Sequence, residues 1–233
     1  MPGSLPDLFD DAPEEARGSP YARSAIDRLS FTLKMRERGY RDTALLRAFE
    51  LVPRESFAPR RYADLARRDI ALPLACGQTM TAPLALARLI TLAAIEPGCR
   101  VLEIGAGSGY ATAILAHLAG EVLSVERFRS LAVEAEGKLK DFGPGRTEVL
   151  HADGLQSLGR GQFDRIVIDG GLPTWPQRLI DTLAPGGRMV ACVGEGGEAR
   201  LRTLDKSASG APVELANEQA RRPLLVSGRA ETL

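Results

Sequence analysis

The sequence predicts an α/β fold of the Rossmann-like, doubly wound type, with a mostly parallel sheet and an N-terminal helical layer. An apolar run at residues 101–104 leads into Gly105, Gly107 and Gly109, which is typical of a buried strand that turns sharply into a helix. A second buried strand follows at residues 122–125, and strand and helix patterns alternate from there to residue 193. This alternation predicts parallel strands with a ligand at their carboxyl ends.

The composition limits the class of protein and its partners. The chain has 233 residues, of which 44% are hydrophobic, and 30 basic residues balance 30 acidic ones, which argues against a general nucleic-acid binder. Cys76, Cys99 and Cys192 lack disulfide or metal-site spacing. Without a membrane-spanning run or a signal-peptide pattern, the sequence predicts a soluble, cytoplasmic protein with no metal, no nucleic-acid partner and no membrane partner. It makes no prediction of an oligomeric state.

The chain is expected to consist of a tail and one domain. Residues 1–20 are rich in proline and acidic residues without an apolar period, which predicts a disordered acidic tail. Residues 21–233 are expected to form a single domain. Within it we expect a helical part at 21–75, a cofactor-binding core at 76–194 and C-terminal edge strands at 195–233.

Helices precede the core. A ragged apolar stripe predicts a helix at 22–38 that Gly39 ends. Asp42 is placed to cap a second helix that Pro53 ends, and a short helix is expected within 60–68.

Residues 72–83 are predicted to form a loop, because prolines and glycine interrupt them. Gln78, Thr79 and Thr81 lie among apolar neighbours, as expected of polar groups directed at a ligand. The alternative is a plain turn, in which Thr81 is the N-cap of a helix at 84–94 and Pro83 lies in its first turn.

The glycine turn predicts a cofactor. A dinucleotide fingerprint, G-x-G-x-x-G, requires glycine where this chain has Tyr110. The spacing G-x-G-x-G, with an acidic residue two positions ahead, suits S-adenosylmethionine (SAM), whose methionyl end needs close contact with the main chain. The predicted cofactor contacts in this stretch are Glu103, Gly105, Ala106, Gly107, Ser108 and Gly109.

Acidic residues after the next two strands extend the cofactor site. A helix at 110–118 and a strand lead to Glu126, about 20 positions past the glycines, where a carboxylate can accept from both ribose hydroxyls. After a helix at 129–142 and a strand at 147–151, Asp153 can accept from the adenine amino group; the alternative is a turn or capping residue. The neighbouring Arg127 and Gly154 complete the predicted cofactor site.

The remaining elements are read from turn residues between apolar runs. They are a strand at 163–168, a loop at 169–173, a helix at 175–183, a turn at 184–187, a strand at 188–193, and edge strands at 201–204 and 223–226 around a loop at 207–212.

Two further motifs carry a family resemblance: Gly-Gln-Thr-Met-Thr-Ala-Pro at residues 77–83 and Val-Pro-Arg at 52–54. With them the sequence resembles the protein-L-isoaspartate O-methyltransferases, SAM-dependent repair enzymes that methylate the abnormal carboxylate of isoaspartyl residues. The glycine turn alone marks only the methyltransferase superfamily. The matching stretches are residues 41–59, 77–83, 101–110, 152–154, 163–164 and 183–188.

The resemblance implies that Thr81 is the catalytic residue. In the family a hydroxyl residue at this position lies between the methyl donor and the acceptor carboxylate. We expect Thr81 to position the acceptor and not to act as a base, since a carboxylate is already a nucleophile. The implied substrates are isoaspartyl-containing proteins or peptides. Neither His117 nor His151 is placed to take part.

Three departures from the family pattern leave alternatives for the acceptor. Thr81 replaces the usual serine and narrows the pocket, and residues 223–227 match only faintly. Asp169 puts a negative charge where the family has small alanines, which costs affinity for an anion unless Asp169 is paired or turned away. The alternatives are a methyltransferase of this family with a different carboxylate acceptor and a catalytically silent SAM-binding protein. The glycine spacing argues against a nicotinamide oxidoreductase.

Overall fold

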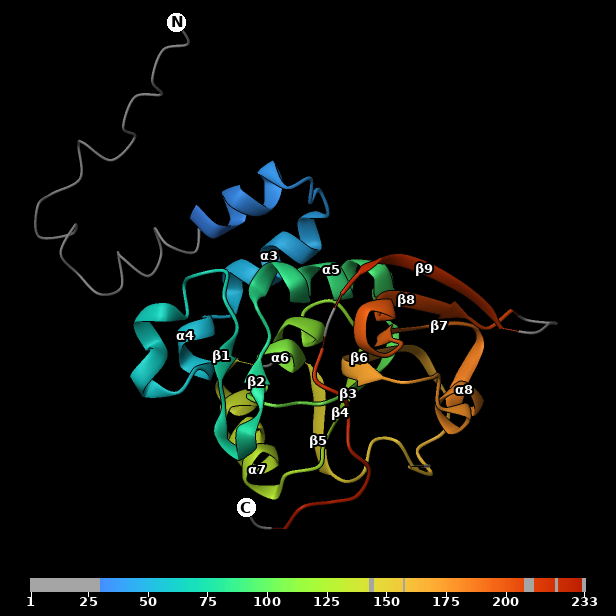
Figure 1. Cartoon of the computed structure of the whole chain (residues 1–233). Coiled ribbons are helices and arrows are strands. Elements are labelled where there is room, and N and C mark those ends of the chain that lie inside the picture. Colours follow the sequence, from blue (N-terminus) through green and yellow to red (C-terminus); the bar gives the residue numbers. More distant parts are fainter. Residues whose placement is uncertain (1–29, 143–144, 157, 208–211, 221, 232–233) are drawn as a thin grey trace, which may run out of the picture.

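A seven-stranded sheet forms the centre of the structure (Figure 1). The computed structural model describes residues 30–142, 145–156, 158–207, 212–220 and 222–231. The predicted acidic tail, residues 1–20, and the start of the helix predicted for 22–38 lie outside the described residues. In spatial order the strands are β5 (Arg146–His151), β4 (Glu121–Glu126), β3 (Arg100–Ile104), β6 (Phe163–Leu172), β7 (Leu183–Val193), β8 (Arg200–Asp205) and β9 (Val213–Gln219).

The strand order creates a ligand-binding crevice. The chain runs outward from β3 through β4 to β5, then returns to the other side of β3 as β6 and continues outward to β7. All of these neighbours pair in parallel, whereas β8 and β9 are antiparallel at one edge. The switch in direction next to β3 separates the loops at the carboxyl ends of the strands, which is where doubly wound sheets bind ligands.

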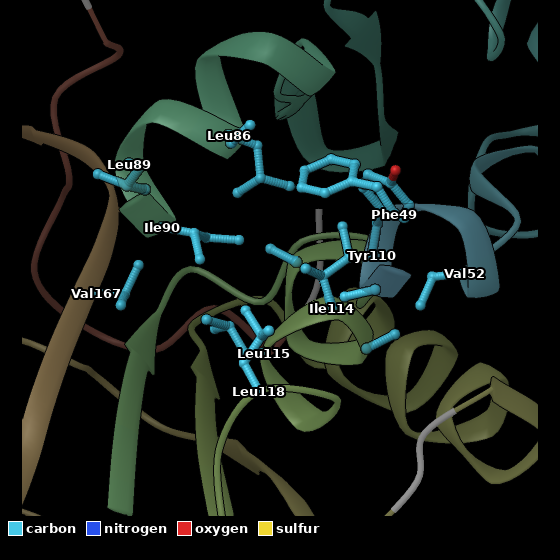
Figure 2. Close-up of a cluster of buried hydrophobic side chains, with 14 of the residues drawn as sticks. Phe49, Val52, Leu86, Leu89, Ile90, Tyr110, Ile114, Leu115, Leu118 and Val167 are labelled. Carbon is cyan, nitrogen blue, oxygen red and sulfur yellow. The ribbon is translucent and has the colours of Figure 1, made fainter. Parts of the chain in front are cut away.

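Helices cover both faces of the sheet. Successive strand residues point to opposite faces, so that Val101 packs in one apolar cluster and Leu102 in the other. Figure 2 shows part of the first cluster, where side chains such as Phe49, Leu86 and Ile114 meet above the sheet. The helices of the first cluster include α5 (Pro83–Ala93), α6 (Tyr110–Ala116) and α7 (Arg129–Phe142), and α8 (Gln177–Thr182) packs in the second.

The predicted N-terminal helical layer is present. It comprises a helix at residues 30–37, α3 (Thr43–Leu51), α4 (Arg54–Phe57) and the 3-10 helix η1 (Arg60–Leu65). Asp42 caps α3 as predicted, because its carboxylate accepts from the backbone N–H groups of Ala44 and Leu45 at 2.9 and 3.2 Å. Phe49 and Phe57 pack against the Tyr110 ring and so join the layer to the start of α6.

Three predictions in the second half of the chain are wrong. The turn predicted at 184–187 lies within β7, Leu183–Val193. The predicted loop at 169–173 is largely strand, since β6 continues to Leu172 across a register shift between Val167 and Gly171. Residues 223–226 are not an edge strand. They make one isolated bridge, Leu224 to Gly171, and Pro223 has no backbone N–H to donate to a strand ladder. The edge is formed by β9, which pairs antiparallel with β8.

The described helices include none with the length and apolar character needed to cross a bilayer.

Candidate active site

A cavity of about 910 Å³, counting its part open to solvent, lies at the carboxyl ends of β3 and β4. It is bounded by the glycine turn, the loop that ends at Thr81, the residues after β5 and the C-terminal segment 224–226. All predicted site residues line it except Glu103 and Gly109. Those that do are Gln78, Thr79, Thr81, Gly105, Ala106, Gly107, Ser108, Glu126, Arg127, Asp153 and Gly154.

The glycine turn has a backbone conformation with positive φ angles, which its glycines allow. Gly105 and Gly107 have φ values of 95° and 54°, a region that side chains with a Cβ rarely adopt. The turn is tied to β4, because the Gly105 N–H donates to the Val125 carbonyl at 2.8 Å. Gly109 serves packing: a Cβ there would lie 3.1 Å from the Cβ of Ala135 on α7. It therefore lets α6 and α7 approach closely and does not reach the cavity.

Glu126 and Asp153 border the cavity and are both bonded to backbone. The Glu126 carboxylate accepts from the N–H groups of Gly107 and Phe128, each at 2.9 Å. Asp153 accepts from Leu155 N–H at 3.0 Å, as the turn alternative predicts, and also lines the cavity. Gly154 leaves no room for a larger residue, since a Cβ would lie 2.7 Å from a methyl carbon of Ile104.

The loop that carries Thr81 is held by a buried arginine. Arg54, 5% exposed, donates to the carbonyl oxygens of Ala66, Ile70 and Thr81 at 3.0 Å each and to that of Arg68 at 3.3 Å. The short strands β1 (Leu72–Pro73) and β2 (Thr79–Met80), joined through the 3-10 helix η2 (Ala75–Gly77), pair in the same loop. Arg54 thus fixes the backbone on either side of this hairpin.

The Thr81 side chain is not a helix cap. α5 begins at Pro83 with Ala82 as its N-cap residue, so the capping alternative for Thr81 is wrong while the place of Pro83 in the first turn is confirmed. The Thr81 hydroxyl instead donates to Oδ2 of Asp169 at 2.7 Å. Asp169 is also paired, since Nε of Arg222 lies 3.3 Å from its Oδ1.

Residues 222–231 form a C-terminal segment that crosses the cavity. At one end, Gly171 N–H donates to the Pro223 carbonyl at 2.7 Å and Leu225 N–H to the Gly171 carbonyl at 2.9 Å. At the other end, Gly228 N–H donates to Asp153 at 2.8 Å. The sequence offered this segment only as an edge strand with a faint family match, not as part of the site. It missed the cavity-lining side chains of Phe128 and Leu155, because no periodic pattern marks them.

Glu103 is buried behind the turn and does not line the cavity. Its Oε2 accepts from the hydroxyls of Thr112 on α6 and Ser124 on β4, at 2.5 and 2.6 Å, whereas Oε1 has no hydrogen-bond partner in the described part of the chain. Burial raises the pKa of Glu103 from 4.5 to about 7, against the opposing effect of these two hydroxyls. The carboxyl faces α6 and not the cavity, so that Glu103 lies behind the main chain of the glycine turn and the other predicted cofactor residues of this stretch, Gly109 excepted, line the cavity.

The raised pKa of Glu103 predicts a pH dependence of stability. The folded state binds the Glu103 proton more tightly than the unfolded state does, so the protonated carboxyl stabilises the fold. This contribution to the free energy of unfolding is complete below pH 4.5 and is lost as the pH rises to about 7. Glu103→Gln cannot ionise, so the variant should gain about 3 kcal/mol relative to wild type between pH 4.5 and pH 8. Urea unfolding of both proteins across this pH range measures the difference between their free energies of unfolding. The other titrating groups contribute equally to both proteins and so cancel from this difference. A difference that stays constant with pH would contradict the prediction.

No cluster of three or more His, Cys, Asp or Glu side chains in the described ranges is arranged to hold a metal ion.

Comparison with known proteins assigns the family. The family model described as protein-L-isoaspartate(D-aspartate) O-methyltransferase (PCMT) matches residues 28–225. The chain belongs to the PCMT family. A protein-L-isoaspartate O-methyltransferase 2 of Rhodopseudomonas palustris is 43% identical over 171 residues, 73% of this chain and 79% of the relative. A protein-L-isoaspartate O-methyltransferase of Xanthobacter autotrophicus is 38% identical over 210 residues, 89% of this chain and 95% of the relative.

Solved PCMT structures share the fold. A Plasmodium falciparum structure assigned to the family, in complex with S-adenosyl-L-homocysteine, has a TM-score of 0.73 and 21% identity and covers 84% of this chain and 97% of its own. A second protein-L-isoaspartate O-methyltransferase has a TM-score of 0.74 and 23% identity, covering 86% of this chain and 66% of its own. The predicted family, fold class and enzyme class, a SAM-dependent methyltransferase, are therefore confirmed.

Proposed function

We propose that this protein transfers the methyl group of SAM to the free carboxylate of L-isoaspartyl residues in proteins or peptides. One observation carries the proposal: a single cavity is bordered at one end by the glycine turn with Glu126 and at the other by the hydroxyl of Thr81. Membership of the PCMT family supports the same reaction.

The donor end of the cavity has the features that SAM requires. Main chain free of Cβ atoms at Gly105 and Gly107 suits the methionyl end, and the Glu126 carboxylate suits the ribose hydroxyls. We assign the adenine to Asp153, with Phe128 and Leu155 as apolar walls. Gln78, Thr79, Ala106, Ser108, Arg127 and Gly154 complete the proposed cofactor site.

The chemistry asks little of the protein beyond placement. Bound SAM supplies an electrophilic methyl carbon, which forms a bond to a carboxylate oxygen as its bond to sulfur breaks, giving a methyl ester and S-adenosylhomocysteine without proton transfer. The protein has to hold the carboxylate in line and keep water out. We assign the first task to the Thr81 hydroxyl and the second to Leu224 and Leu225, which line the cavity from the C-terminal segment.

We also propose a cytoplasmic location, with no nucleic-acid or membrane partner. The zero net charge and the free thiols of Cys76, Cys99 and Cys192 support it.

Labelled SAM tests the proposed reaction directly. The protein is incubated with methyl-tritiated SAM and either an isoaspartyl peptide or the same peptide with a normal aspartyl residue. We expect transfer of label to the isoaspartyl peptide alone. Equal labelling of both peptides would contradict the proposal. SAM binding by calorimetry without label in either would favour a silent SAM-binding protein.

Two variants in the same assay test the role of Thr81. Thr81→Val keeps the shape but removes the hydroxyl, and a lost hydrogen bond to a charged group predicts a fall in kcat/KM of about 10- to 100-fold. Thr81→Ser keeps the hydroxyl and serves as the matched control, with activity near that of wild type. Equal losses in both variants would show that the hydroxyl has no special part.

A further inference from the structure

The acceptor end of the cavity already contains a carboxylate. Asp169 lines the cavity, and its two oxygens face different groups. Oδ2 accepts a hydrogen bond from the Thr81 hydroxyl at 2.7 Å, whereas Oδ1 forms an ion pair with Nε of Arg222 at 3.3 Å and has no hydrogen-bond partner in the described part of the chain. The side chains of Asp169 and Arg222 are only 12% and 19% exposed. A hydroxyl and a guanidinium thus converge on one position of the size and charge of a carboxylate.

Neighbouring glycines bring Arg222 to this position. The C-terminal segment packs on Gly170 and Gly171, where a Cβ would lie 2.5 Å from a Leu225 methyl and 2.8 Å from the Arg222 carbonyl oxygen. Larger residues at 170 and 171 would displace the segment and Arg222 with it. The sequence Asp-Gly-Gly at 169–171 and Arg222 therefore act as one arrangement.

This arrangement conflicts with a bound acceptor. Thr81 has one hydroxyl proton, which it donates to Asp169, and an acceptor carboxylate can only accept hydrogen bonds. The negative charge of Asp169 would also repel a second carboxylate beside it, because Arg222 is already paired with Asp169. The acceptor can therefore bond to Thr81 only if Asp169 gives up the hydroxyl.

We propose that Asp169 is an internal competitor of the substrate: it holds the Thr81 hydroxyl and the Arg222 guanidinium until the acceptor carboxylate displaces it and binds both. Arg222 is then a specificity-determining residue that selects an anionic acceptor, and Asp169 lowers the affinity for that acceptor. This inference rests on the proposed function, since it takes the methyl acceptor to be a carboxylate.

Asp169→Asn tests the competition, because it keeps the size of the side chain and removes its charge. We expect KM for the isoaspartyl peptide to fall about tenfold, with the change in KM and not in kcat. A twin peptide with a carboxamide in place of the reacting carboxylate serves as a competitive inhibitor, and its inhibition constant should change less than about twofold. Glu218→Gln, which removes the acid of an exposed ion pair with Arg88, is the matched control and should leave KM unchanged.

Arg222→Gln tests whether Arg222 binds the acceptor carboxylate. It should raise KM for the isoaspartyl peptide about tenfold and cancel the gain of Asp169→Asn when the two are combined. Unchanged or raised KM in Asp169→Asn, or equal shifts for acid and carboxamide peptides, would overturn the inference. If Arg222→Gln does not fold, as judged by its thermal unfolding, the Asp169→Asn measurements decide alone. If wild type methylates no peptide, the proposed function fails, and calorimetric affinities of both peptides for the protein loaded with S-adenosylhomocysteine still decide the inference.

Discussion

Replacement of Gly107 by valine is expected to lower the affinity for SAM by about a hundredfold or more. Gly107 has a φ of 54°, which a β-branched residue adopts only with strain, and a Cβ there would lie 3.3 Å from a Leu74 methyl. The added methyl groups would enter the cavity that Gly107 lines, and a shifted backbone would break the bond from its N–H to Glu126. Isothermal titration calorimetry with SAM measures the loss.

A matched glycine separates this effect from general backbone strain. Gly186 has a φ of 77°, a Cβ there would meet no atom of the described residues within 4 Å, and it does not line the cavity. Gly186→Val should therefore lose stability but bind SAM as wild type does. Retained affinity in Gly107→Val would refute the role of the turn in binding the cofactor.

Replacement of Arg54 by lysine is expected to reduce the free energy of unfolding by about 3 kcal/mol or more. The planar guanidinium reaches the carbonyl oxygens of Ala66, Arg68, Ile70 and Thr81, and a lysine ammonium cannot span all four positions. Carbonyl groups would then remain without partners in the buried surroundings of Arg54, which is 5% exposed. Urea unfolding measures the loss.

Activity should fall together with stability in Arg54→Lys, because the released Thr81 carbonyl lets the loop move away from the acceptor. The fall should appear at temperatures where the variant is still folded and at saturating SAM. Arg47→Lys, at a side chain that is 67% exposed, is the control and should change neither property. Wild-type stability in Arg54→Lys would mean that the four contacts contribute nothing.

Local patterns are enough to predict the donor end of the site. Glycine spacing, a buried strand and an acidic residue at the end of the next strand all lie within one β-α-β unit, from β3 to Glu126. The hydrophobic period of each element is local as well, so α7 is found at its predicted bounds, Arg129–Phe142. Most of the predicted cofactor residues accordingly meet at one cavity.

The acceptor end could not be predicted because its contacts join distant parts of the chain. Asp169 is recognisable in the sequence as an added charge, but its partner Arg222 comes from a segment next to a predicted edge strand that does not form. The four carbonyl partners of Arg54 likewise depend on how a loop folds back, which no periodicity encodes. The position of the Glu103 carboxylate depends on its neighbours on α6 and β4. The hydroxyls of Thr112 and Ser124 donate to this carboxylate, which the motif alone would assign to the cofactor.

The C-terminal segment has a thermodynamic consequence for turnover. Its backbone is bonded to Gly171 beside the acceptor end and to Asp153 at the donor end, so one length of chain responds to both ligands. By linkage, any factor by which the methyl donor changes the affinity for the acceptor must be returned by the acceptor on the donor. Because contacts at both ends of the cavity lie on this one segment, we expect donor and acceptor binding to be coupled through the position of residues 222–231.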